Sequence, residues 1–414
     1  MLETSWSLST VHNSNSANLL RAILKTTLVP QILFPYGFAK APMAVRLKDI
    51  ARDLGVSLIT VSKALRGMGD ISEETRQRVL KRMAELNYRP NMLARGLASG
   101  KTYIVGLIVP DLLHPFFAEF AKSLNGVLRH HNYGLILASS EEDPEIERQE
   151  IRTVLARGVD ALLIASCQPT LQGFYGVEDQ RTPFILIDRD FPHLSAHFVG
   201  TDDYAAGLMA TRHLLSTGKR RIAHIAGPDL APGLDRLRGY KDALAKEGIR
   251  VRQEYIISNA RVEEIGEDVG CQGMHKLLQR KPRPDAVFCY NDLTAIGAIH
   301  AVLEAGLSIP DDIAFVGCGN VRYSDYLRVP LSSIDQSTGL LGEQAGKLAL
   351  ELINNRATAA KHIRLKPTLV VRTSSVVSDL PIEAATDGKS GVRSQAKTSK
   401  KSNPRVHSRI SAKK

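Results

Sequence analysis

The sequence predicts a small all-α unit near its N-terminus, followed by a large α/β body of two lobes whose parallel sheets carry helices on both faces. Two patterns predict this architecture. Apolar residues recur at helical spacing in the segment that begins at Arg46. From Tyr103 onward, short aliphatic runs alternate with amphipathic segments, which favours parallel sheets. The expected strands are too many for one comfortable sheet, so we expect two similar lobes with a cleft between them.

The first part of the helical unit has the pattern of two short helices joined by a tight turn. Leu47, Ile50 and Leu54 recur at helical spacing, and Gly55 breaks the pattern. Ser57 stands where an N-cap opens the second helix. This arrangement is typical of a helix-turn-helix.

The second helix has an inner stripe of Val61, Ala64 and Leu65, so its other side chains must face outward. Two bulky aliphatic residues at an exposed helix start are costly unless something covers them. The outward-facing set comprises Leu58, Ile59, Ser62, Lys63 and Arg66.

A third helix is expected to begin after Ser72, with Val79, Met83 and Leu86 on its inner face. The segment from Arg46 to Lys101 carries twelve Lys and Arg against six Asp and Glu, a net charge of +6. Such a charge on so small a surface suits a polyanion such as DNA. The alternative is that it is the solvated charged face of an ordinary small bundle.

Outside this unit the charge is uneven. The whole chain has a net charge of +11, of which residues 379–414 supply +6, whereas residues 102–378 have a net charge of −3. The large middle region is therefore nearly neutral. This charge distribution favours a sensing or catalytic body to which a basic appendage is attached. Its expected strands are Ile104–Val109, Leu135–Ala138, Ala161–Ala165, Phe184–Ile187, Ile222–Ala226, Ala286–Tyr290 and Ile313–Gly317, and its expected helices include Phe116–His130, Ile146–Arg157, Tyr204–Leu215, Leu234–Lys246 and Thr294–Glu304.

The two ends of the chain differ from the body in composition. Residues 1–42 contain a segment resembling a signal peptide, but Pro30 and Pro35 interrupt its apolar run, so we expect a mis-called start or a disordered extension. The basic tail, residues 377–414, has no apolar periodicity and is expected to be disordered. No apolar run reaches the roughly 20 residues of a membrane span. The four scattered cysteines favour a reducing cytoplasm.

Enzyme motifs give no specific signal. The segment from Gly96 to Thr102 resembles a phosphate loop, but it has three residues between its glycines instead of four and precedes a strand instead of following one. We found no dinucleotide fingerprint, no nucleophile elbow and no zinc-protease motif. We therefore expect no catalytic residues, no metal site and no cofactor.

Six segments of the chain have a distinctive combination of motifs. They are LKDIARDLGVSLITVSKAL, NYRPNMLARGLASGKT, IDRD at 187–190, RLRGY at 236–240, NDLTAIGA at 291–298 and LSSIDQ at 331–336. Through these segments the chain resembles the lac repressor (LacI/GalR) family of bacterial transcriptional regulators over about residues 46–375. The family has a two-lobed sensor of the periplasmic-binding type. The implied domains are a DNA-binding head at 43–89, a hinge helix and linker at 90–102, and an effector-binding and dimerisation domain at 103–376.

The resemblance implies that the second helix enters the major groove. Leu58, Ile59 and Lys63 then take the positions that read base edges, and the two aliphatic side chains favour thymine methyl groups. The implied contacts to the DNA backbone come from Thr60 and Ser62, with Asn91 also placed in the DNA-binding set.

Residues 90–98 resemble the hinge helix of the family. Such a helix folds on the operator and wedges a leucine, here Leu97, into the minor groove. A helix of two turns is marginal alone, so hinge folding is the expected switch. The alternative for Leu97 is ordinary packing in a linker.

The resemblance also implies an effector site between the lobes, formed by Phe116, Phe117, Asp188, Arg189, Arg236, Asn291 and Gln336. Aromatic rings suit the apolar face of a sugar, and the polar groups suit its hydroxyls. Two departures weaken the expectation of a sugar, because relatives commonly have an acid where this chain has Gly319 and an Asn where it has His114. We therefore also consider a smaller or anionic effector, such as a sugar phosphate, held by Arg189 and Arg236. An alternative is that Asp188 and Arg189 only pair with each other.

Together these inferences predict a cytoplasmic, homodimeric repressor that binds a palindromic double-stranded operator under the control of a sugar-like effector. A symmetric pair of heads multiplies specificity on a palindromic site. The alternatives are a solute-binding transport or chemotaxis receptor, which needs secretion, and an enzyme that uses the cleft.

Overall fold

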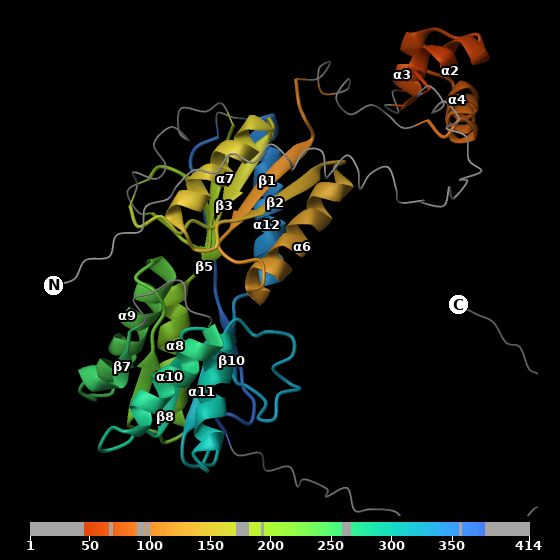
Figure 1. Ribbon diagram of the computed structural model, residues 1–414. Helices are drawn as coiled ribbons and strands as arrows, with labels where there is room; N and C mark the ends of the chain where they lie inside the picture. The colour runs from red at the N-terminus through yellow and green to blue at the C-terminus, as the bar shows by residue number, and fades with distance from the viewer. Residues whose placement is uncertain are drawn as a thin grey trace, which may run out of the picture. The chain divides into compact units, whose positions relative to one another are not determined.

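The computed structural model describes residues 45–65, 69–88, 96, 100–170, 182–191, 194–258, 266–355 and 358–376 (Figure 1). The chain forms two compact units that divide after Asn91, and each is described by itself. The first contains the helical head, and the second contains the α/β body. In the part of the chain that the structure describes, no helix is long and apolar enough to cross a membrane.

The head consists of helices α2 (Leu47–Leu54), α3 (Leu58–Leu65) and α4 (Glu73–Glu85). Gly55 ends α2 in the left-handed conformation with φ of 62°, which glycine adopts at little cost. The expected caps form, because the Thr60 N–H donates to Ser57 Oγ at 3.0 Å and the Thr75 N–H to Ser72 Oγ at 3.2 Å. The buried core of the head comprises Ile50, Ala51, Val61, Ala64, Val79 and Met83.

In the body, the first lobe contains a six-stranded sheet in which every neighbouring pair is parallel. Helices α6 (Pro115–His130) and α12 (Thr338–Asn354) pack on one face of this sheet, and α7 (Pro144–Ala156) packs on the other. Both faces are covered, so the inner strands β1, β3 and β4 are almost wholly apolar. In spatial order they are β11 (His362–Leu365), β5 (His197–Thr201), β4 (Phe184–Ile187), β3 (Ala161–Ile164), β1 (Ile104–Val109) and β2 (Gly134–Ser139).

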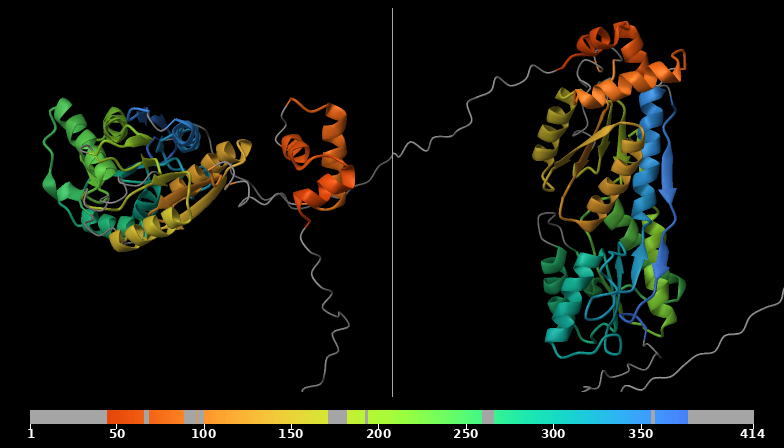
Figure 2. Two further views of the ribbon diagram at one scale, coloured as in Figure 1. Left: turned by 90° about the horizontal axis from the view of Figure 1, so that it is seen from above. Right: turned by 90° about the vertical axis from the view of Figure 1, so that its right-hand side faces the viewer.

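The second lobe repeats this plan (Figure 2). Helices α8 (Asp203–Ser216) and α9 (Ala231–Lys246) cover one face of its sheet, while α10 (Gly266–Leu278) and α11 (Asp292–Glu304) cover the other. Its strands are, in order, β12 (Thr368–Val370), β10 (Ser333–Asp335), β9 (Ala314–Cys318), β8 (Ala286–Cys289), β6 (Ile222–Ile225) and β7 (Ile256–Ile257). All neighbours are parallel except β10 and β12, which are antiparallel.

The chain passes between the lobes three times. It leaves the first lobe after β5 and enters α8, returns from β10 into α12, and crosses again from β11 to β12. The lobes are therefore each built from separate stretches of sequence. The cleft between them lies where these crossings meet the carboxyl ends of the parallel strands.

The seven expected strands all form, with ends within one residue of the prediction, and the five expected helices also form. Four of the strands that the prediction omitted are short or lie at sheet edges, whereas β5 has five residues and lies inside its sheet. The omitted strands are β5, β7, β10, β11 and β12, and the omitted helices are α10 and α12.

Glycines let the paired helices of the second lobe approach closely, which positions part of the cleft. A Cβ added at Gly207 in α8 would lie 2.1 Å from the Arg236 carbonyl oxygen in α9. Gly239 in α9 meets α8 in the same way, because its added Cβ would lie 2.3 Å from the Tyr204 carbonyl oxygen. The absence of side chains at these positions thus fixes the separation of α8 and α9.

Replacing Gly207 by alanine should lower the free energy of unfolding by about 1–3 kcal/mol, because a backbone oxygen blocks the new methyl group. Gly126, an exposed helical glycine in α6 with open space around it, provides the matched control. There the same change should stabilise the protein by about 0.5–1 kcal/mol. Urea unfolding of both variants measures the difference, and equal effects would contradict the close-packing argument.

Candidate functional site

The recognition surface of the head lies on the outer side of α3. Leu58 and Ile59 are 51% and 65% exposed, as the sequence predicts. Thr60 is half-buried, and its hydroxyl lies 2.8 Å from that of Ser57. Two large aliphatic side chains in solvent beside the cap of a short helix form a surface suited to cover by a partner.

Lys63 and Ser62 also lie on α3 and are half-buried. The Lys63 ammonium pairs with the Asp70 carboxylate in the loop before α4. A phosphate or base that contacts Lys63 must therefore compete with Asp70. Asn91 and Leu97, the remaining residues of the predicted DNA-binding set, lie outside the described residues. The same is true of the rest of the predicted hinge helix, residues 90–98, except Gly96, and of the terminal segments 1–42 and 377–414.

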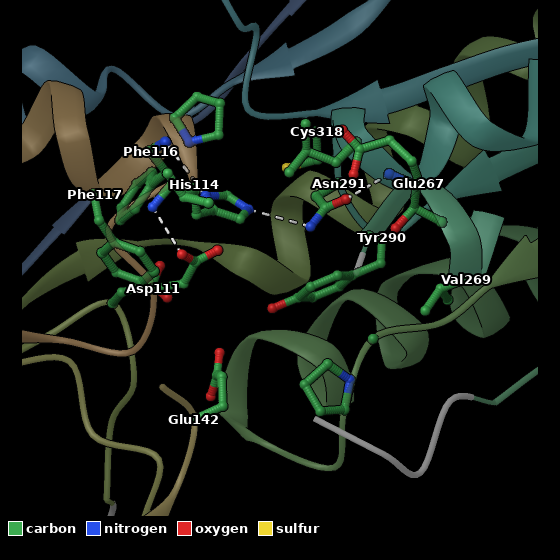
Figure 3. Close-up of a pocket in the computed structure, with 18 of the residues that line it drawn as sticks. Asp111, His114, Phe116, Phe117, Glu142, Glu267, Val269, Tyr290, Asn291 and Cys318 are labelled. Carbon is green, nitrogen blue, oxygen red and sulfur yellow. Dashed lines mark hydrogen bonds between the residues drawn. The ribbon is translucent and has the colours of Figure 1, made fainter. Parts of the chain in front are cut away.

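All seven residues of the predicted effector site line one cavity of about 390 Å³ between the lobes of the body. Figure 3 labels Phe116, Phe117 and Asn291 among them. The seven residues come from separate elements at the cleft. Phe116 and Phe117 open α6, Asp188 and Arg189 follow β4, and Arg236 lies in α9. Asn291 caps α11, and Gln336 lies in the crossing between β10 and α12.

Arg236 is buried against the floor of the cavity by an ion pair that the sequence analysis missed. Its Nε and Nη2 donate to Asp203 Oδ1 at 2.8 and 2.7 Å, and its Nη1 donates to the Tyr290 carbonyl oxygen at 2.8 Å. The guanidinium also lies 4.8 Å from the centre of the Tyr290 ring. Arg236 thus joins α8, α9 and the end of β8.

Arg189 forms a second ion pair, on the first-lobe side of the cavity. Its Nη2 and Nη1 donate to the two carboxylate oxygens of Glu142 at 2.7 and 2.8 Å. Nη1 also contacts the Ser166 carbonyl oxygen at 3.2 Å. The alternative in which Arg189 only pairs with Asp188 is therefore wrong. The basis for an anionic effector is also removed, because each arginine already holds a carboxylate.

Asp188 is left as a buried acceptor at the cavity wall. Its backbone is left-handed with φ of 60°, a conformation that costs energy in a residue other than glycine and is concentrated at functional sites. Among the described residues, none donates a hydrogen bond to its carboxylate, and its N–H donates to the Val199 carbonyl oxygen at 3.0 Å. Burial raises the pKa of this carboxyl, against the lowering effect of the nearby Arg236 and Arg189.

His114 meets Asn291 across the cleft. The imidazole Nδ1 accepts from the Phe116 N–H at 3.3 Å, and Nε2 lies 3.3 Å from Asn291 Nδ2. The Asn291 side-chain Oδ1 accepts from the Thr294 N–H at 2.8 Å, so the Nδ2 amino group faces the histidine. A neutral imidazole accepts at only one nitrogen, so the two contacts of His114 compete. The contact between the lobes is therefore easily exchanged for one to a ligand.

Aromatic and amide groups complete the cavity. Phe116 and Phe117 pack edge to face with centroids 5.1 Å apart, and Tyr290 projects into the cavity from the opposite lobe (Figure 3). Gln336 Nε2 donates to Thr201 Oγ1 at 3.4 Å, which links two of the crossings. Glu142, Asp203 and Tyr290 were missed. Tyr290 directly follows β8 and Asp203 opens α8, but the sequence does not show which acids the arginines select.

The structure gives no sign of metal or thiol chemistry in this site. Within the described ranges, no three His, Cys, Asp or Glu side chains are grouped so that they could hold a metal ion. The Cys318 thiol lines the cavity, and burial raises its pKa to about 12, so it is uncharged at neutral pH.

A three-helix head with an exposed apolar recognition helix and a two-lobed body with a polar cleft define a DNA-binding protein of the ligand-responsive type. Residues 46–91 match the family model "Bacterial regulatory proteins, lacI family", and residues 211–375 match "Periplasmic binding protein-like domain". The chain belongs to the LacI family and is a DNA-binding transcriptional regulator.

Individual relatives match nearly along their whole length. The ribose operon repressor of Haemophilus influenzae is 33% identical over 329 residues, covering 79% of this chain and 98% of that protein. The lac repressor dimer bound to operator and the anti-inducer ONPF has a TM-score of 0.66 at 26% identity, covering 80% and 99% of the two chains. The complex of the regulator CelR with cellobiose has a TM-score of 0.60 at 29% identity, with the same coverage.

Removing the guanidinium of Arg236 leaves Asp203 as an uncompensated buried charge. Arg236→Met should therefore lower the free energy of unfolding by about 3–5 kcal/mol. Adding Asp203→Asn should recover part of this loss. Arg238→Met, which breaks an exposed pair with Asp235 on the same helix, should cost less than about 1 kcal/mol. Urea unfolding distinguishes these cases, and simple additivity of the two cleft substitutions would contradict the pairing.

The stability of the body should depend on pH through His114. Burial, together with the charges of Arg189 and Arg236, lowers the pKa of His114 to about 4 from its ordinary value of 6.5. The unfolded chain therefore binds this proton first, and the stabilising contribution is complete above pH 6.5 and is lost as the pH falls toward 4.

His114→Asn removes this titration and keeps a capping side chain at the start of α6. Thermal unfolding of both proteins from pH 7 to pH 5 should show the wild type losing stability relative to the variant. A difference in Tm that does not change with pH would contradict this assignment.

Proposed function

We propose that the protein is a homodimeric repressor of the cytoplasm whose affinity for a palindromic operator is controlled by an uncharged, sugar-like effector bound between the lobes. The single observation that carries this proposal is the convergence of all seven expected effector residues on one polar cavity.

The head is proposed to place α3 in the major groove. Leu58 and Ile59 cannot form hydrogen bonds to bases, so their exposed side chains favour thymine methyl groups. Thr60 and Ser62 lie nearby on the same helix and are proposed to contact phosphates. Lys63 contributes by leaving Asp70 and reaching a base or phosphate.

Asn91 and Leu97 are proposed to act in the hinge, with Leu97 as the minor-groove wedge. A short helix forms only with support from DNA and a partner subunit, so the proposal requires a dimer. The lac repressor, to which this chain is similar, is a dimer on its operator in the solved structure. Two heads on a palindrome also double the base contacts that one small head can make.

The cavity is proposed to bind hydroxyl groups. Asp188 offers a buried acceptor with no donor among the described residues, while the Asn291 and Gln336 amides offer both donors and acceptors. The rings of Phe117 and Tyr290 provide apolar surface for the face of a sugar. The regulator CelR, to which this chain is similar, binds cellobiose in its solved structure, which supports the same ligand class here.

The cleft also suits the two alternative classes of function, a solute receptor and an enzyme. A solute receptor makes no use of the head and its exposed recognition helix. An enzyme would convert a bound sugar to product, and the relatives that match this chain are regulators. The test below therefore includes a measurement of whether the protein converts the bound sugar to a product, as an enzyme would.

The test begins with selection of bound sequences from a random DNA pool by the full chain. The operator affinity is then measured with and without ribose, galactose and cellobiose. Leu58→Ala combined with Ile59→Ala should weaken operator binding at least about tenfold, because several apolar contacts are lost. The same variant should keep the thermal stabilisation that an active sugar gives to the body.

Asp188→Asn provides the reciprocal variant. It should keep operator binding in the absence of sugar and lose the stabilisation by sugar. Failure of the selection to enrich any sequence would contradict the DNA-binding proposal. Equal operator affinity with and without every sugar that stabilises the protein would contradict effector control.

A further inference from the structure

The cavity has an excess of negative charge once the ion pairs of its side chains are taken into account. Four carboxylates line it, those of Asp111, Glu142, Asp188 and Glu267. The two lining guanidiniums, Arg189 and Arg236, are each held by a carboxylate at 2.7–2.8 Å. His114 is uncharged at neutral pH, because its pKa is about 4. An anionic group that enters the cavity therefore meets unpaired negative charge and no available cation among these residues.

Glu142 occupies its position through an unusual backbone. Glu141 and Glu142 both adopt the left-handed conformation, with φ of 49° and 58°. Such residues cost energy and persist where the surrounding structure requires them. The Glu142 N–H donates to the Pro110 carbonyl oxygen at 3.1 Å, and Asp143 then caps α7. The loop thus turns Glu142 into the cavity while Glu141 remains exposed (Figure 3).

Arg189 is the group that an anion would otherwise use. Its guanidinium is buried beside the cavity, and its planar fork matches a phosphate as well as it matches a carboxylate. Glu142 occupies that fork with both oxygens. A phosphorylated ligand would have to displace an intramolecular carboxylate that does not diffuse away, and would then lie beside it.

We propose that Glu142 is a specificity-determining residue that makes the cleft reject phosphorylated and carboxylated ligands by occupying Arg189. The identity of the natural ligand rests on the proposed function, whereas the test below does not depend on it. A ligand in this cleft must be uncharged and rich in hydroxyl donors, because Asp188 accepts and Arg189 is already engaged. The same cleft without the Glu142 charge should accept an anion.

The test uses inorganic phosphate as the probe, so it requires no knowledge of the natural effector. Thermal unfolding of the full-length protein is followed at pH 7 with increasing phosphate, against sodium chloride at matched ionic strength. The wild type should show no stabilisation by phosphate beyond that of chloride. Glu142→Gln, which keeps the shape and removes the charge, should bind phosphate at least about tenfold more tightly than the wild type.

Three further variants locate the effect. Glu141→Gln, in the same strained loop but exposed, should behave as the wild type. Glu142→Gln combined with Arg189→Gln should lose the new phosphate binding, because the guanidinium that Glu142 released is absent. Glu142→Ser, made in parallel, removes the charge with a smaller side chain and should bind phosphate as Glu142→Gln does.

The proposal is overturned if phosphate stabilises the wild type as much as Glu142→Gln, or if neither charge-removing variant gains phosphate binding. Failure of both of these variants to fold would make Glu142 a purely structural partner of Arg189 and would also overturn it. A negative result with sugars and operator DNA affects only the proposed function, because the phosphate measurement is independent of both.

Discussion

The three crossings of the chain between the lobes are the constraint on which the rest of the body depends. They place the carboxyl edges of the two sheets opposite each other, and three short segments join the lobes. Gln336 lies in one crossing and hydrogen-bonds to Thr201 at the start of another. A ligand that contacts Gln336 therefore contacts one of the crossings between the lobes. Ligand binding and the relative orientation of the two lobes are coupled through this contact.

Local sequence patterns predicted most of the fold because the central strands of the body are mostly aliphatic and alternate regularly with amphipathic helices. The omitted strands lack that local signal. β10 contains Ser333 and Asp335, and β11 at a sheet edge alternates between exposed and half-buried residues. Their structure depends on neighbours distant in the sequence. The packing of α12 in the first lobe is likewise set by a chain crossing, which no local pattern encodes.

The site was predictable to a similar extent. The resemblance placed seven side chains that do meet in one cavity, but it left the state of the arginines open. Glu142 lies 47 positions before its partner Arg189, and Asp203 lies 33 positions before Arg236. Glu142 follows Glu141 directly, and only the backbone conformation decides which of the two enters the cleft. Charge pairing at such separations is a tertiary property.

The pair between Lys63 and Asp70 gives the head its own built-in counterion. In the proposed complex Lys63 leaves Asp70 to reach a base or phosphate, and the Asp70 carboxylate then lies near a polyanion without that ammonium. The gain from the new contact is therefore reduced by the loss of the surface pair and by repulsion between Asp70 and the phosphates. Asp70 thus weakens the attraction of the head to any DNA that does not draw Lys63 away.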